Sequence, residues 1–150
     1  MGSRVGAASG LYSVEQAMID RMGNVLQFQG QALVLRAERQ RLVAANIANA
    51  DTPGYVARDF DFASALRQAT SDAGAVGAAG APAGAAQSPG RFQPRLQYAQ
   101  PAQASLDGNS VDMDRERAAF VDNALKYEAT LRFLNSSVRT MLEAMKSHNG

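Results

Sequence analysis

The sequence contains no cysteine and no tryptophan, and its single histidine, His148, stands close to the C-terminal end. A chain without cysteine can form neither a disulfide nor a thiolate nucleophile, and it cannot bind a metal ion through sulfur. No serine or threonine has a recognisable base among its neighbours in the sequence, so no catalytic pattern is visible. We therefore expect a protein that is not an enzyme and that uses no cofactor, metal ion or small-molecule substrate.

Net charge and long apolar runs are missing as well. The formal charge is +1 at pH 7, and lysine and arginine form no extended run, so the chain lacks the basic surface that attracts nucleic acid or an anionic membrane. No segment holds the roughly 18 consecutive apolar residues that a transmembrane helix needs. The N-terminus has no basic region followed by an apolar one, which argues against a cleaved signal peptide.

The clearest pattern that the sequence does contain is a helix near the C-terminus. From Asp112 to about Ser147 there is no glycine or proline, and apolar residues recur at alternating spacings of four and three, as in a heptad seam. Asp112 stands where a carboxylate caps the start of a helix. A second stripe, Leu125, Ala129 and Phe133, makes the apolar face wider than one partner helix would cover. The seam itself consists of Phe120, Ala124, Tyr127, Leu131, Leu134, Val138, Met141 and Met145.

A second helical pattern runs from about Val14 to Asn49 and is less regular. Gly30 in its middle costs about 1 kcal/mol relative to alanine, so we expect a kink or a frayed turn there. Asn46 and Asn49 lie one turn apart among alanines near its end. Two interpretations of this pair stay open. The asparagines either end the helix, as asparagine often does, or form hydrogen bonds to another helix that approaches closely over the alanines.

The chain turns sharply after this helix. Pro53 presets the first central position of a turn, and Gly54 supplies the positive φ that a type II turn requires. Residues 58–62 alternate charged and aromatic side chains as an extended segment does, and Asp61 is placed to cap a short helix that ends near Gln68.

The middle of the chain offers little to bury. Fifteen of the 21 residues at 70–90 are alanine, glycine or proline, which predicts a mobile loop. Residues 92–98 then alternate apolar and polar side chains as an extended arm, and Pro94 restricts that arm to an edge or unpaired strand. Asp107, Gly108 and Asn109 turn the chain into the last helix.

Together these patterns predict a mainly α fold. Two long terminal helices pair as a coiled-coil-like hairpin, joined by an extended, partly disordered middle with little strand. Such a hairpin closes a long loop and buries few side chains, so its apolar faces are satisfied only when neighbouring molecules cover them. We therefore expect a subunit of an assembly. A coiled-coil adaptor or secretion chaperone that binds one partner helix is the alternative.

Three stretches of the sequence resemble a known family. The string ANIANADTPGY at residues 45–55 resembles the N-terminal signature of the bacterial flagellar axial proteins, which form the rod, the hook and the hook junction. Residues 58–62 and 105–114 resemble the cell-proximal rod subunits of that family.

The resemblance implies a structural role. It implies a subunit of the flagellar basal-body proximal rod in the periplasm, exported without signal cleavage and built into a helical oligomer that helps to form the drive shaft for motility. The implied partners are other rod subunits (FlgC-like), a rod-base adaptor (FliE-like), the MS ring and the export apparatus. When isolated, the chain should be monomeric or weakly associating.

The resemblance also divides the chain. Residues 18–50 and 105–150 are the two helices of an axial core domain. Between them lie a turn, an extended segment and a short helix (51–69), then a flexible loop with an extended arm (70–104). Residues 1–17 are an added tag or an extension outside the family pattern. The expected assembly interface consists of Asn46, Asn49, Pro53, Gly54, Tyr55, Phe120, Ala124, Tyr127, Leu131, Leu134, Val138, Met141 and Met145.

Overall fold

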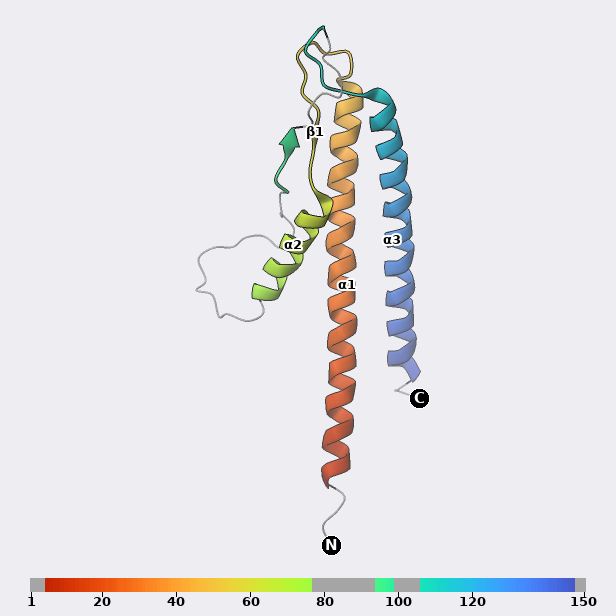
Figure 1. Ribbon diagram of the computed structural model, residues 1–150. Coiled ribbons are helices and arrows are strands. Elements are labelled where there is room, and N and C mark those ends of the chain that lie inside the picture. Colours follow the sequence, from red (N-terminus) through yellow and green to blue (C-terminus); the bar gives the residue numbers. More distant parts are fainter. Residues whose placement is uncertain (1–4, 77–93, 99–105, 148–150) are drawn as a thin grey trace.

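The computed structural model describes residues 5–76, 94–98 and 106–147. Three helices and a two-stranded ribbon make up this part of the chain (Figure 1). The helices are α1 (Val5–Ala48), α2 (Phe62–Val76) and α3 (Met113–Ser147). The strands are β1 (Arg58–Asp59) and β2 (Gln97–Tyr98). The long helices α1 and α3 form a hairpin, which confirms the predicted mainly helical fold.

Helix α1 is longer and more regular than the sequence pattern suggests. It begins at Val5, so the expected start near Val14 is wrong, and it continues through Gly30 without the expected kink or frayed turn. Its first turns include the weak helix formers Gly6, Ser9 and Gly10, so helix propensity does not account for the early start. Ala32 and Leu35 are buried just after Gly30, which offsets the cost of that glycine. The reading of residues 1–17 as a tag or extension stays a prediction.

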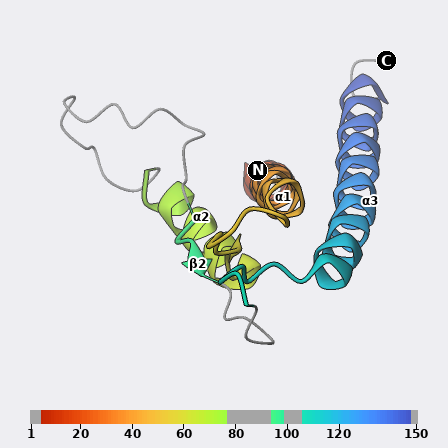
Figure 2. The same ribbon diagram turned by 90° about the horizontal axis from the view of Figure 1, so that it is seen from above.

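Helix α3 begins where the sequence predicts. The Asp112 carboxylate accepts hydrogen bonds from the backbone N–H groups of Asp114 and Arg115, both at 3.1 Å, and so caps the helix. Seen from above, α1 is nearly end-on whereas α3 shows much of its length, so the two helices cross rather than run parallel (Figure 2). Helix α1 also extends well past the last turn of α3 (Figure 1).

The apolar core lies on the side of α1 that faces α2. Leu35 and Leu42 of α1 meet Phe60 and Ala65, and partly buried Phe62 and Leu66 pack against this cluster. The guanidinium carbon of Arg36 lies 4.6 Å from the centroid of the Phe62 ring. A buried apolar cluster therefore joins α1 to α2 and to the loop that precedes α2.

Helix α2 continues to Val76, so the expected end near Gln68 is wrong. Asp61 caps it as expected, with its carboxylate accepting from the N–H groups of Ala63 and Ser64. The Thr70 hydroxyl donates to the Leu66 carbonyl at 2.9 Å, one turn back, in the part of the helix that continues past Gln68. The remainder of the expected mobile loop, residues 77–93, lies outside the described residues.

The extended segments predicted around residues 58 and 97 do pair with each other. Strands β1 and β2 are antiparallel, with Arg58 opposite Tyr98 and Asp59 opposite Gln97. Pro94 precedes β2 and is buried, in keeping with its exclusion from a paired strand. None of the helices in the described part of the chain is long and apolar enough to cross a membrane.

Two adjacent positions on α1 test where the core lies. Leu35 is 1% exposed and Val34 is 46% exposed. We expect Leu35→Ala to lower the free energy of unfolding by about 3 kcal/mol through cavity formation, and Val34→Ala to change it by less than about 0.5 kcal/mol. Urea unfolding followed by circular dichroism at one protein concentration measures both. Equal effects at the two positions would contradict this placement of the core.

Candidate assembly surface

Asn46 joins three parts of the fold and is 1% exposed. Its amide donates to the Arg58 carbonyl at 2.9 Å and to the Glu116 carboxylate of α3 at 3.1 Å. Its carbonyl oxygen accepts from the Arg58 N–H at 3.0 Å and from the Tyr55 hydroxyl at 3.2 Å. Both polar atoms of this side chain are thus satisfied, as a buried amide requires.

Asn49 has a different role. Its amide donates back to the Ala45 carbonyl at 2.8 Å, and its side-chain oxygen accepts from the Thr52 hydroxyl at 3.3 Å. These contacts are local and end the helix. Of the two interpretations left open by the sequence, hydrogen bonding between helices therefore applies to Asn46, and helix termination applies to Asn49.

The turn after α1 has the predicted geometry. The Tyr55 N–H donates to the Thr52 carbonyl at 3.2 Å, and Gly54 has a φ of 72° between them. Pro53 and Gly54 therefore occupy the two central positions that a type II turn assigns to them. Tyr55 points back to Asn46 and so ties the turn to α1.

A second asparagine, far along the chain, holds the turn that follows α1. The Asn109 amide donates to the carbonyls of Asn49, Ala50 and Thr52 at 3.0, 2.8 and 2.9 Å. These carbonyls lie beyond the last residue of α1, and those of Asn49 and Thr52 also accept from backbone N–H groups within the turn. Residues 107–110 also bond to the turn, because the Gly54 N–H donates to the Asp107 carbonyl and the Ser110 N–H donates to the Tyr55 carbonyl. We refer to residues 49–58 and 107–111 together as the clasp.

Charged groups beside Asn46 connect α1 to β1 and α3. Arg39 forms a two-point ion pair with Asp59, with N–O distances of 3.1 and 2.7 Å. Burial raises the pKa of Glu116 above its ordinary value, although the hydrogen bond from Asn46 acts in the opposite direction. Burial lowers the pKa of Arg36, because here too it disfavours the charged form of the side chain.

The row of α3 that faces α1 is polar. Glu116, Asn123, Thr130 and Ser137 lie seven residues apart, and Asn123 and Thr130 are the only fully buried residues among those described in α3. The Asn123 amide donates to the Arg36 carbonyl at 2.8 Å and to the Gln40 side chain at 2.7 Å, and Gln40 donates to the Phe120 carbonyl at 3.4 Å. Polar groups thus fix the register of the two helices.

The predicted apolar seam of α3 lies beside this polar row and remains largely uncovered. Leu134 and Met141 are partly buried, but Leu131, Val138 and Met145 are 37%, 39% and 62% exposed. The other seam members, Phe120, Ala124 and Tyr127, are exposed as well. Of the second stripe, Leu125 and Phe133 are exposed. We call the set Phe120, Ala124, Tyr127, Leu131, Val138 and Met145 the exposed seam.

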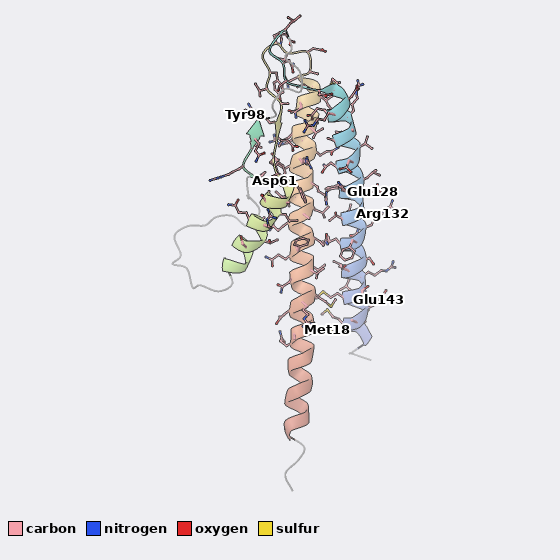
Figure 3. The ribbon with its side chains drawn as sticks, viewed as in Figure 1. Met18, Asp61, Tyr98, Glu128, Arg132 and Glu143 are labelled. Atoms are coloured by element: carbon pink, nitrogen blue, oxygen red, sulfur yellow. The ribbon has the colours of Figure 1, made fainter. Side chains whose placement is uncertain are left out.

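Six charged residues of α3 form ion pairs within the helix. Lys126 bonds to Asp122 at 2.7 Å and Arg132 to Glu128 at 2.6 Å, each one helical turn apart. Glu128, Arg132 and Glu143 lie on the side of α3 that faces away from α1 (Figure 3). Such pairs keep α3 helical and soluble without contacting another element.

Near the far end of the hairpin the facing surfaces do not match in polarity. Met18 of α1 lies beside the last turns of α3 (Figure 3), at a groove of about 310 Å³. The groove is lined by Met18, Arg21, Met22, Val25 and Leu26 of α1 and by Ser136, Ser137 and Thr140 of α3. Here α3 again presents small polar side chains to α1 and directs its apolar ones elsewhere.

Comparison with known proteins identifies the family. A family model described as flagella basal body rod protein matches residues 26–55. The flagellar basal body rod protein FlgB of Escherichia coli K12 is 48% identical over 141 residues, covering 88% of this chain and 100% of that protein. The chain belongs to the FlgB family. The FlgB proteins of Proteus mirabilis HI4320 and Cereibacter sphaeroides are 45% and 41% identical and cover 86% and 81% of this chain, with 98% and 93% of their own lengths matched.

Membership of the FlgB family makes the chain a structural subunit of the flagellar basal body rod. It lends no support to the alternative of an adaptor or secretion chaperone. The segment matched by the family model spans the second half of α1 and the turn, and therefore includes both Asn46 and the Pro53–Gly54 pair.

Sequence reasoning missed several residues of this site. The sequence indicates only a turn at Asn109 and no role for Asn123. It predicts a solvated helix face for Arg39, in a run of mixed charges, whereas Arg39 pairs with Asp59. A heptad row of polar residues beside the apolar seam was visible in the sequence and is the signal that identifies Asn123. No local pattern reveals Asn109, because its acceptors lie up to 60 residues earlier in the chain. Within the described residues, no three His, Asp or Glu side chains gather as metal ligands.

The raised pKa of Glu116 gives the hairpin a pH dependence with a defined sign. The folded state binds this proton more tightly than the unfolded chain, so the contribution to stability is present below about pH 4.5 and is lost as pH rises through the higher folded pKa. Glu116→Gln removes the ionisation but keeps an oxygen that can accept from Asn46. We expect this variant to melt at a higher temperature than the wild type at pH 7 and at a similar temperature near pH 4.

The control for this prediction is Glu128→Gln, which alters an exposed carboxylate on the outer side of α3. It should not raise the melting temperature at pH 7. Thermal unfolding followed by circular dichroism at both pH values measures each difference. A Glu116→Gln variant that is less stable than the wild type at pH 7 would contradict the burial argument.

Proposed function

We propose that this rod subunit assembles through the exposed seam of α3. The observation that carries the proposal is the polarity of α3: its row facing α1 is polar, whereas its apolar seam is exposed. Exposed apolar side chains at heptad spacing are typical of a helix that packs against a further helix. Asn46, Asn49, Pro53, Gly54 and Tyr55 contribute by holding the hairpin that presents the seam.

A contact of this kind builds a polymer when it is heterologous. We expect a neighbour to cover the seam of α3 with a different surface, and so to leave its own seam free for the next subunit. Head-to-tail contacts that do not close generate a helical array. This supports the assignment of the chain to the proximal part of the rod, with a non-enzymatic role.

The finer assignments follow from the resemblance to the axial proteins. We propose that the chain crosses the inner membrane through the flagellar export apparatus without signal cleavage and joins the periplasmic part of the rod at the MS ring. FlgC-like subunits and a FliE-like adaptor are the proposed neighbours. Affinity capture of the assembled basal body after in vivo crosslinking at seam positions tests these contacts directly.

A charge in the exposed seam should prevent assembly. We expect Leu131→Asp to abolish swimming of a strain that lacks the native subunit, while export of the variant continues. Each buried leucine contributes about 1.5 to 3 kcal/mol, and the contact repeats in every subunit. Swimming in soft agar and immunoblotting of purified basal bodies measure the effect.

The matched control is Arg139→Asp, which introduces the same carboxylate at an exposed charged position of α3. It should leave swimming nearly unchanged. Leu134→Asp instead alters a side chain that is partly buried against α1, so it should also weaken the isolated hairpin. Normal motility of the Leu131→Asp strain would refute the proposed interface.

The isolated chain should gain structure when molecules associate. Because the seam is uncovered in one molecule, we expect helicity to rise with protein concentration and the thermal transition to be broad in dilute solution. Circular dichroism over a hundredfold range of concentration tests this expectation. A sharp transition that is independent of concentration would show that the single molecule is complete without neighbours.

A further inference from the structure

We infer that Asn109 is a positioning residue that sets the direction in which α3 leaves the end of α1. This inference rests on the proposed function, because the direction of α3 decides where the exposed seam points. Asn109 is 7% exposed and lies in the clasp, close to the first turn of α3. Its contacts join the turn that follows α1 to the segment that leads into α3.

On one side Asn109 is fixed to the turn that follows α1. Its amide nitrogen lies 2.8 to 3.0 Å from the carbonyl oxygens of Asn49, Ala50 and Thr52, just beyond the last residue of that helix. Three acceptors around one amide group define the position of the side chain much more tightly than a single hydrogen bond does. The asparagine therefore cannot rotate relative to α1 without losing several contacts at once.

On the other side Asn109 fixes the backbone that enters α3. Its side-chain oxygen accepts from the Val111 N–H at 2.8 Å, and its own N–H donates to the Asp107 carboxylate at 3.1 Å. Helix α3 begins at Met113, two residues after Val111. Asp112, which lies between them, caps that helix. The orientation of Asn109 thus sets the direction of the backbone at Val111, and the cap at Asp112 continues that direction into α3.

The surrounding clasp leaves little room for another arrangement. Gly54 and Gly108 both have positive φ, at 72° and 73°. A Cβ atom placed on Gly108 would lie 3.7 Å from the Gly54 Cα, so the two turns are in contact. The Ser110 hydroxyl also accepts from the Ala57 N–H at 2.8 Å. The turn after α1 and the turn before α3 therefore form one unit.

Packing between α1 and α3 cannot replace this control. The row of α3 that faces α1 is polar and includes only two fully buried residues among those described, so side-chain interlocking fixes the crossing angle weakly. A small rotation at the clasp moves the far end of a 35-residue helix by several ångströms. The seam residues near that end, Val138 and Met145, would then miss their partner surface.

A distance measurement between the far ends of the hairpin tests the inference. The chain has no cysteine, so Gln27→Cys on α1 and Arg139→Cys on α3 can carry two spin labels at exposed positions. Electron paramagnetic resonance of the full chain then gives the distribution of their separation. At a protein concentration where helicity no longer rises, we expect a single narrow distribution, and a broadened or displaced one in Asn109→Ala, with helicity by circular dichroism retained.

Further variants separate positioning from general stability. Asn109→Asp keeps a side-chain oxygen that accepts from Val111 but loses the N–H donors to the carbonyls of the turn after α1. It should therefore broaden the distribution of label distances as Asn109→Ala does. Asn135→Ala, at an exposed asparagine of α3, should change nothing. An unchanged distribution in both Asn109 variants, or broadening only in proportion to lost helicity, would overturn the inference.

The same labels distinguish this inference from the proposed interface. Leu131→Asp should leave the distance distribution intact and still prevent incorporation into basal bodies. Asn109→Ala should alter the distribution and also reduce incorporation. If Leu131→Asp is incorporated normally, the proposed interface fails, and the distance measurement on Asn109 variants still decides the positioning role.

Discussion

The arrangement of this molecule depends on a polar contact between its two long helices. Asn46 of α1 holds the Glu116 carboxylate of α3, and Asn123 of α3 holds a backbone carbonyl and a side chain of α1. A polar residue at the contact between two helices specifies their register at a cost in stability. Each of these groups must be paired, so a slip of one helix along the other would leave buried amides and a carboxylate without partners. The hairpin is therefore well defined in register without being strongly held by apolar packing.

As a result, the two long helices have different roles. Helix α1 takes its apolar stability from Leu35, Leu42, Phe60 and Ala65, on the side where α2 and β1 cover it. Helix α3 has no such core of its own and leaves its seam free for other molecules. A subunit of the flagellar rod needs both properties. It needs a defined arrangement of its two long helices, and it needs an uncovered apolar surface that can bind a neighbouring subunit.

Local signals in the sequence predicted the local structure well. The cap at Asp112, the turn at Pro53 and Gly54 and the cap at Asp61 all depend on residues a few positions apart, and all have the expected geometry. The pattern also identified both long helices, but it placed the start of α1 near Val14 instead of Val5, because the start was inferred from apolar periodicity and the small residues of the first turns carry little of that signal.

Tertiary features were less accessible from the sequence. The heptad pattern of α3 was read correctly, but periodicity alone does not say which of two neighbouring rows faces α1, and the polar one does. The role of Asn109 depends on acceptors 57 to 60 residues earlier, a separation that no local rule spans. The division of roles between Asn46 and Asn49 likewise became clear only with α3 in place, since the two share the same local sequence.

The hydrogen bonds from Asn109 to the turn after α1 have a consequence for timing. Any chain that leaves a ribosome does so with its N-terminus first, so α1 and the turn after it emerge while the carbonyls of that turn still lack the Asn109 amide. That partner follows 60 residues after Asn49. Closing so long a loop is entropically slow compared with the growth of a single helix. The hairpin therefore forms only after most of the chain has emerged. Two chains that meet before that point cannot yet associate through it.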